Sequence, residues 1–246
     1  MDRALYTAMG AASAVLDQQA VVSNNMANAS TPGFRAQLSA FRAVPVEGQT
    51  IPTRTMVASS TPGNDFSMGP VEHTGRDLDV ALQQDGWLAV QLPDGGEGYT
   101  RNGNIEVDSE GQLRVGGLPL MGDGGPIAVP PQSQITIAPD GTVSALGAGD
   151  EAKAIAQVGR LKMVRASGNE LQHGDDGLFH AQDQQDALPN DPTLRLIPGA
   201  IEGSNVSPVK AMVSMIGNAR QFEMQMKVVS NVSDNAQRAN QLLGPA

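Results

Sequence analysis

Apolar residues recur at spacings of three and four near the N-terminal end of the chain, which is the pattern of an amphipathic helix. The positions that share this spacing are Leu5, Met9, Ala12, Leu16, Gln19, Ser23 and Met26. Pro32 and Gly33 follow soon afterwards, and this pair stops a helix. We therefore expect a helix within residues 1–30 that ends near Asn28.

The C-terminal end has a longer and more regular pattern. Ser207 suits the N-cap of a helix and Pro208 its first position. Beyond them, apolar residues recur about every 3.5 residues, which is the coiled-coil period. These positions are Met212, Ile216, Ala219, Phe222, Met226, Val229, Val232, Ala236, Ala239 and Leu243. We expect a helix of about 35 residues, about 50 Å long at 1.5 Å per residue, that ends at Gly244-Pro245.

Neither apolar stripe is wide enough to stabilise a lone helix in water, so each helix needs a partner surface. The stripes are narrow and suited to pairing. We therefore expect the two terminal helices to pair with each other as a coiled coil.

The chain between the helices lacks a helical period. Residues 31–70 hold Pro45, Pro52, Pro62 and Pro70 among Ser, Thr and Gly, and they are interpreted as an extended connector. Residues 71–200 hold short apolar runs separated by Gly and Asp turns, which favours antiparallel strands. The predicted strands cover residues 78–82, 87–92, 104–107, 112–115, 127–129, 135–138, 142–145, 154–164, 178–181 and 194–197.

These patterns predict an α+β chain with paired terminal helices and a central antiparallel all-β domain. Its parts are an N-terminal helix in residues 1–30, a connector in 31–70, a β domain in 71–200 and a C-terminal helix in 201–246.

The net charge of −10 is unevenly distributed. Both terminal segments are nearly balanced, and the acidic excess falls on residues 43–200. An acidic middle argues against binding nucleic acid or anionic lipid, whereas nearly neutral ends can pack against further copies. No stretch approaches the ~20 apolar residues of a membrane span. Asp2 lies beside Arg3 and Gly10 interrupts the first apolar run, so we expect no cleaved signal peptide.

The sequence contains no catalytic or cofactor motif. The chain has no cysteine, which excludes disulfides, Cys nucleophiles and Cys metal ligands. His73, His173 and His180 lack the spacing of a metal site, and Asp175-Asp176-Gly177 lacks the rest of a calcium loop. Paired carboxylates of a glycosidase stay open as an alternative. We expect neither enzymatic activity nor a cofactor or bound metal.

Three separated parts of the chain carry a family resemblance. The first holds the series Asn28-x-x-Thr31-x-Gly33-Phe34-Arg35 directly after the N-terminal helix. The other two lie in the β domain and at the C-terminal helix, and comprise residues 74–82, 85–90, 99–103, 201–209, 211–213 and 220–225. Together they resemble bacterial flagellar rod and hook proteins. Within this family the chain is most similar to subunits of the proximal rod.

The resemblance implies a structural subunit of the basal body that assembles into the rod within the periplasm. Its partners would be other rod proteins, copies of itself and the flagellar export apparatus, which would export it without a cleaved signal. The paired helices would line an axial tube that transmits torque and passes exported subunits, with the acidic β domain outside. Asn28, Thr31, Gly33 and Phe34 would form the exit from the first helix.

The same resemblance implies that the apolar stripes of both helices form the assembly interface. The residues concerned are Leu5, Met9, Ala12, Leu16, Met212, Ile216, Ala219, Phe222, Met226, Val229 and Leu243. Lys210 departs from the family pattern, in which this position often carries Glu. A Glu there would complete a capping box with Ser207. The stretch 95–98 also departs from it.

Three alternatives remain open. The chain could be a distal rod or another hook or rod axial subunit, a wall-hydrolysing enzyme, or a soluble adhesin or binding module that is stable as a monomer.

Overall fold

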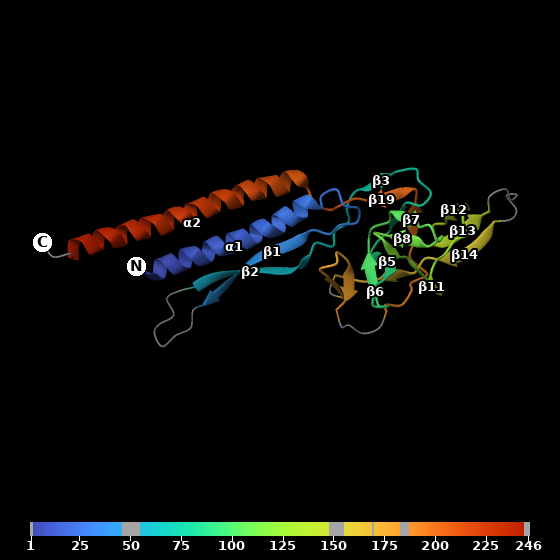
Figure 1. Cartoon of the computed structure of the whole chain (residues 1–246), viewed down its shortest axis with the longest axis horizontal. Coiled ribbons are helices and arrows are strands. Elements are labelled where there is room, and N and C mark those ends of the chain that lie inside the picture. The colour runs from blue at the N-terminus through green and yellow to red at the C-terminus, as the bar shows by residue number, and fades with distance from the viewer. Residues whose placement is uncertain (1, 46–54, 148–154, 169, 183–186, 244–246) are drawn as a thin grey trace. The chain divides into compact units, whose positions relative to one another are not determined.

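The computed structural model describes residues 2–45, 55–147, 155–168, 170–182 and 187–243 (Figure 1). A helix stands at each end of the chain and antiparallel strands lie between them, so the predicted α+β class is confirmed. The chain forms two compact units. The helical unit comprises residues 1–29, 36–65 and 206–246, and the β unit comprises residues 30–35 and 66–205.

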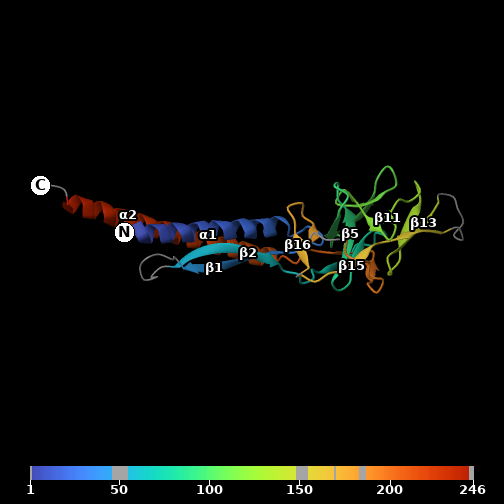
Figure 2. The ribbon, with the colours of Figure 1, turned by 90° about the horizontal axis from the view of Figure 1, so that it is seen from below.

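Two helices dominate the helical unit. α1 (Asp2–Ala27) has 26 residues and α2 (Pro208–Leu243) has 36. They lie side by side and run in opposite directions, as both views of the ribbon show (Figures 1 and 2). The first turn of α2 forms around Ser207, whose carbonyl oxygen accepts from the amide of Ala211 at 3.0 Å and whose Oγ lies 3.5 Å from the amide of Lys210. No helix among the described residues is long and apolar enough to cross a membrane.

A long β-hairpin completes the helical unit. β1 (Gln37–Pro45) pairs antiparallel with β2 (Thr55–Asn64), with a register shift between Leu38 and Ala40. The hairpin packs against α1, where the side-chain amide of Asn25 exchanges two hydrogen bonds of 2.9 and 2.8 Å with the backbone of Gln37. The interpretation of residues 31–70 as an extended connector did not anticipate this pairing.

Seventeen short strands are described in the β unit. They are β3 (Val71–His73), β4 (Val80–Leu82), β5 (Gly86–Gln91), β6 (Glu97–Thr100), β7 (Ile105–Val107), β8 (Leu113–Val115), β9 (Leu118–Pro119), β10 (Met121–Gly122), β11 (Gly125–Pro126), β12 (Gln134–Ile137), β13 (Thr142–Leu146), β14 (Ala156–Arg160), β15 (Met163–Arg165), β16 (Leu171–His173), β17 (Phe179–Ala181), β18 (Leu196–Pro198) and β19 (Ala200–Glu202). The largest sheet has the order β15-β5-β6-β17-β16, and the strands pair antiparallel.

Two pairs of the predicted strands form antiparallel hairpins. β7 and β8 pair Ile105 with Val115, and the carboxylate of Asp108 closes the turn by accepting from the amides of Glu110 and Gln112 at 2.9 and 2.8 Å. β12 and β13 form the second hairpin. The single strand predicted at residues 154–164 is wrong, because β14 pairs with β13 whereas β15 pairs with β5 in another sheet.

Apolar side chains from these sheets fill two clusters. The larger one contains Leu88, Ile105, Leu113 and Val143, all fully buried. The second gathers aromatic rings, with the centroids of Trp87 and Phe179 4.7 Å apart. The β unit therefore has its own core, as the alternation of its strands predicts.

Candidate assembly interface

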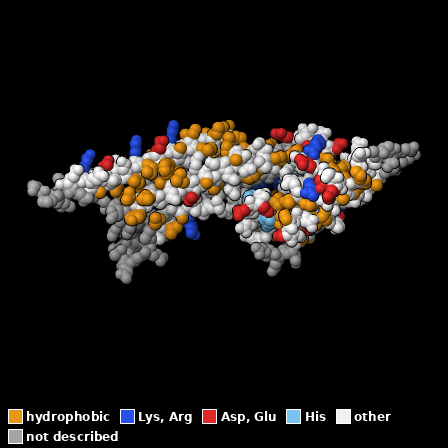
Figure 3. Space-filling view, in the orientation of Figure 1, with side chains coloured by type: hydrophobic (Ala, Val, Ile, Leu, Met, Phe, Trp, Pro, Cys, Tyr) orange, Lys and Arg blue, Asp and Glu red, His pale blue; other side chains and the backbone are white. Residues whose placement is uncertain are grey.

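The side of α2 that faces away from α1 carries large apolar residues. Val209, Met212 and Ile216 are 67%, 47% and 56% exposed. Val213, Ala219 and Met226 are also exposed. We call this surface the outer stripe and define it by Val209, Met212, Val213, Ile216, Ala219 and Met226. Hydrophobic side chains gather over the helices in the space-filling view (Figure 3).

A different series of α2 residues is buried or half-buried. It keeps the heptad spacing but starts one position earlier than the predicted stripe, and we call it the inner series: Ala211, Met215, Asn218, Phe222, Gln225, Val229, Val232, Ala236 and Ala239. Because α2 packs against α1 in this unit, the inner series forms that contact. The predicted interface residues Phe222 and Val229 belong to it, whereas Met212, Ile216, Ala219 and Met226 belong to the outer stripe. The side chain of Leu243 lies outside the described residues.

α1 shows the same division. Ala12 is buried and Leu5 half-buried, whereas Met9 and Leu16 are each 53% exposed. Its other buried side chains are small, namely Ala8, Ala14 and Val15. Small side chains let α1 approach both of its neighbours closely, but they bury little apolar area.

The packing of both helices also buries polar groups. The Nδ2 of Asn218 and the Oε1 of Gln19 are buried and have no hydrogen-bond partner among the described residues. Asn218 is only 6% exposed. A buried polar atom without a partner costs about 1–3 kcal/mol, so this packing is weaker than purely apolar packing.

The family motif after α1 belongs to the β unit, apart from Asn28, whose amide and Nδ2 both bond the carbonyl oxygen of Asn24. Gly33 has φ +70°, and a Cβ there would lie 2.4 Å from the carbonyl carbon of Arg101. Its amide donates to the carbonyl oxygen of Glu202 at 2.8 Å, and the amide of Phe34 donates to that of Thr31 at 3.3 Å. Glycine is thus required at position 33 both by backbone angle and by space.

Three charged side chains are buried together beside this segment. Nη2 of Arg35 lies 2.6 Å from Oε1 of Glu202, and Nε of Arg101 donates to Oε2 at 2.8 Å. Arg35 and Arg101 are each 2% exposed and Glu202 is fully buried. Arg101 also donates to the carbonyl oxygens of Leu82, Gln84 and Gly86, which hold the turn between β4 and β5. We call Arg35, Arg101 and Glu202 the charge cluster.

The charge cluster is compensated by its own hydrogen bonds. Burial lowers the pKa of Arg101, while the neighbouring carboxylate of Glu202 opposes this shift. Sequence reasoning missed the roles of Arg101 and Glu202, although both lie within the stretches that carry the family resemblance. Their separation of 101 residues leaves no local signal for the pairing.

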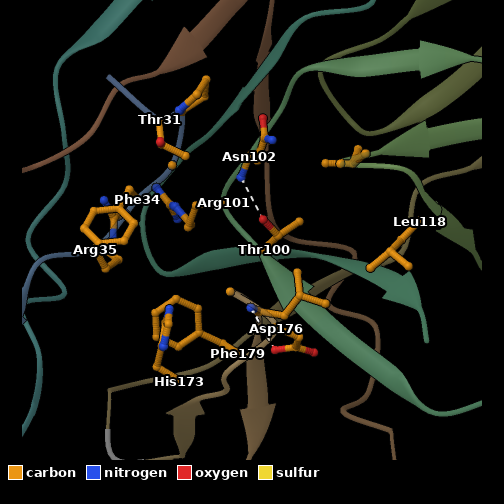
Figure 4. A pocket seen from close by; sticks show the side chains of 16 residues that line it. Thr31, Phe34, Arg35, Thr100, Arg101, Asn102, Leu118, His173, Asp176 and Phe179 are labelled. Carbon is orange, nitrogen blue, oxygen red and sulfur yellow. Dashed lines mark hydrogen bonds between the residues drawn. The ribbon is translucent and has the colours of Figure 1, made fainter. Parts of the chain in front are cut away.

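A hollow of about 190 Å³ lies next to the motif within the β unit (Figure 4). Thr31, Phe34 and Arg35 line one part of it, and His173 and Phe179 another. The rings of His173 and Phe179 meet edge to face at 5.1 Å, and burial lowers the pKa of His173. Nowhere in the described part of the chain do three His, Asp or Glu side chains gather as a metal ion requires.

Comparisons with known families cover both ends and the middle of the chain. Residues 5–35 match the family described as flagella basal body rod protein. Residues 81–145 match the flagellar hook protein FlgE/F/G D1 domain, and residues 197–242 match the flagellar basal body rod FlgEFG protein C-terminal region.

Full-length relatives carry the same description. The chain is 62% identical to the flagellar basal-body rod protein FlgF of Escherichia coli K12, over 99% of both chains. It is 61% identical to FlgF of Salmonella typhimurium LT2 over 99% of both. A flagellar basal-body rod protein FlgG from Buchnera aphidicola is 30% identical over 90% of this chain and 92% of its own length.

The fold and these matches define a structural protein of the bacterial flagellum, not an enzyme. The chain belongs to the flagellar basal-body rod proteins, and within them to the FlgF family. The expectations from the sequence about family and about the absence of enzymatic activity are thereby confirmed.

Proposed function

We propose that this chain is a subunit of the proximal rod that polymerises through its terminal helices, with the outer stripe of α2 as the main contact to neighbouring subunits. The observation that carries this proposal is the division of α2 into two sides. The inner series is already covered by α1, whereas the larger apolar residues of the outer stripe are exposed.

Exposure of this kind is unfavourable for a protein that stays monomeric. Contiguous exposed apolar surface on a soluble protein marks an interaction site. Val209, Met212 and Ile216 follow one another at spacings of three and four along α2, which is the arrangement that a second helix covers. Met9 and Leu16 offer a similar surface on α1. Covering these residues supplies the driving force for assembly.

The charges of α2 are compatible with close packing of many copies. Arg220, Lys227 and Arg238 are interspersed with Glu223 and Asp234 along the helix. Charges of both signs avoid the repulsion that a helix of a single sign would create when copies are packed side by side.

This arrangement and the family membership support a more specific model of assembly. The terminal helices pair as a coiled coil, and copies of the pair line an axial tube that transmits torque and passes exported subunits. The partners are other rod proteins, copies of this chain and, during secretion, the flagellar export apparatus. The rod lies in the periplasm, and the chain reaches it without a cleaved signal peptide.

The test replaces one residue of the outer stripe in cells that lack their own copy of the protein. Ile216→Asp places a charge in the proposed contact, and Ser214→Asp places the same charge at an exposed position on the other flank of α2. Both variants should fold as monomers, judged by circular dichroism. Only Ile216→Asp should abolish motility and be absent from purified basal bodies. Normal incorporation of Ile216→Asp would contradict the proposal.

A further inference from the structure

Glu202 lies where the chain leaves and re-enters the β unit. The chain passes between the two units at residues 29/30, 35/36, 65/66 and 205/206. On the β-unit side, the segments at these four points are joined to one another. The backbone of Glu202 accepts from the amide of Gly33, and its Oε1 accepts from the amide of Gly69 at 3.0 Å.

Further hydrogen bonds join the same segments of the β unit. The amide of Asn205 donates to the carbonyl oxygen of Phe34 at 3.3 Å, and its Nδ2 donates to the carbonyl oxygen of Ser67 at 3.0 Å. The amide of Gly203 donates to the carbonyl oxygen of Pro70 at 2.8 Å. The segment that leads to α1 and the segment that leads to α2 are therefore held directly beside each other.

The side chain of Arg35 secures the segment that leads to α1. Residues 30–35 contribute only this side chain to the charge cluster, and it reaches the carboxylate of Glu202 at 2.6 Å. Arg101 holds the other carboxylate oxygen independently. Loss of the Arg35 charge would consequently leave one arginine paired with one glutamate, which is a balanced buried pair.

This geometry affects the probability that α1 pairs with α2. With residues 30–35 in place, α1 is tethered to the β unit through residues 28–33. Without that anchor the tether runs through residues 28–65, which include the hairpin of β1 and β2. The probability that a flexible loop closes falls with the three-halves power of its length, so the effective concentration of α1 at α2 would fall by at most on the order of tenfold, and by less where the hairpin stays folded on α1.

We infer that Arg35 and Glu202 are positioning residues for the pairing of α1 with α2. They act on that pairing although they belong to the β unit, by holding the two helix-bearing ends of this unit together. The motif after α1 then holds the chain in a position that favours pairing of the two helices, in addition to ending the first helix. This inference rests on the observed helix pair and does not require the proposed site of rod assembly.

Amide hydrogen exchange of the full-length monomer, read by mass spectrometry, tests the inference. Arg35→Met removes the charge but keeps much of the side-chain volume. We expect amide exchange in α1 and in the part of α2 that packs against α1 to accelerate by up to roughly tenfold. Exchange in β5 and β13 should be unchanged. Arg114→Met, which removes an arginine from a surface ion pair with Asp108, should leave the helices unchanged.

Two further variants keep the test decisive. Arg35→Lys restores the charge and should return part of the protection. Gly33→Ala keeps all three charges but dislodges the segment through its contact with the backbone of Arg101, so it should reproduce the effect of Arg35→Met. Unchanged helix exchange in Arg35→Met and Gly33→Ala would overturn the inference. Equal acceleration in helices and β5 would overturn it as well, because Arg35 would then act only through the stability of the β unit.

Discussion

The two units of this chain bury their apolar residues in opposite ways. In the β unit the large aliphatic side chains are inside, and Leu88, Ile105 and Leu113 are fully buried. In the helical unit the buried residues of α1 and α2 are mostly small or polar, such as Ala8, Ala12, Ala211 and Asn218, while the larger apolar residues of α2 are exposed. The β unit buries its large apolar side chains by itself, whereas the helical unit leaves much of its apolar surface exposed.

The largest effect should come from breaking the charge cluster of the β unit. Glu202→Ala leaves Arg35 and Arg101 buried without their carboxylate, and removing one partner of a buried ion pair costs about 3–5 kcal/mol. Urea unfolding followed by the fluorescence of Trp87, which lies in the β unit, measures this loss. Glu106→Ala, at an exposed position of β7, is the matched control and should change little. A loss below about 1 kcal/mol in Glu202→Ala would contradict the structural role of the cluster.

Truncating apolar residues should have clearly different effects on stability in the two units. Leu88→Ala creates a cavity in the larger core cluster and should destabilise the β unit by about 2–5 kcal/mol. Met212→Ala removes a side chain of similar size from the exposed outer stripe and should cost the monomer less than about 0.5 kcal/mol. Thermal unfolding of both purified variants gives the comparison. A similar loss in the two variants would show that the outer stripe is already covered in the monomer.

Replacing the buried amide of α2 should strengthen the helix pair. Asn218→Leu removes an Nδ2 that has no partner among the described residues and adds apolar area, so we expect a gain of about 1 kcal/mol. Helix melting followed by circular dichroism at 222 nm should move to higher temperature. Asn235→Leu, at an exposed position of the same helix, is the control. A lower melting temperature in Asn218→Leu would mean that the amide has a stabilising partner.

The smallest effect concerns pH. Burial lowers the pKa of His173 in the folded β unit below its ordinary value of 6.5. The unfolded chain therefore binds a proton more readily, and stability falls as pH drops from 7 through 6.5 towards the lowered pKa. His173→Gln should flatten the pH dependence of β-unit stability between pH 7 and 5. An unchanged slope in this variant would show that His173 does not contribute to it.

Much of the fold follows from local patterns in the sequence. The heptad spacing after Ser207 predicts α2, and Asp108 and Gly111 predict the hairpin of β7 and β8, because helix periods and turn chemistry are decided within a few residues. The hairpin of β1 and β2 was missed. Its strands contain Pro45 and Pro62 and weak alternation, and such strands are stabilised by packing on α1 rather than by their own sequence.

The interface shows where local patterns stop being sufficient. Apolarity alone favours Met212 and Ile216 as the contact to α1, yet α2 turns the smaller Ala211 and the polar Asn218 inward. A monomer would gain more by burying the larger residues, so this orientation supports the proposal that partner subunits cover them. The charge cluster joins positions 35, 101 and 202, and no periodicity connects residues that far apart.

The central claim is that the outer stripe of α2 is covered by neighbouring subunits in the rod. Because the chain has no cysteine, Ile216→Cys introduces a unique thiol into the stripe. Its reaction with a maleimide is compared between the dilute monomer and isolated basal bodies, with denatured basal bodies as the measure of full labelling. The account predicts rapid labelling in the monomer and protection in the basal body. Equally rapid labelling in both would contradict it.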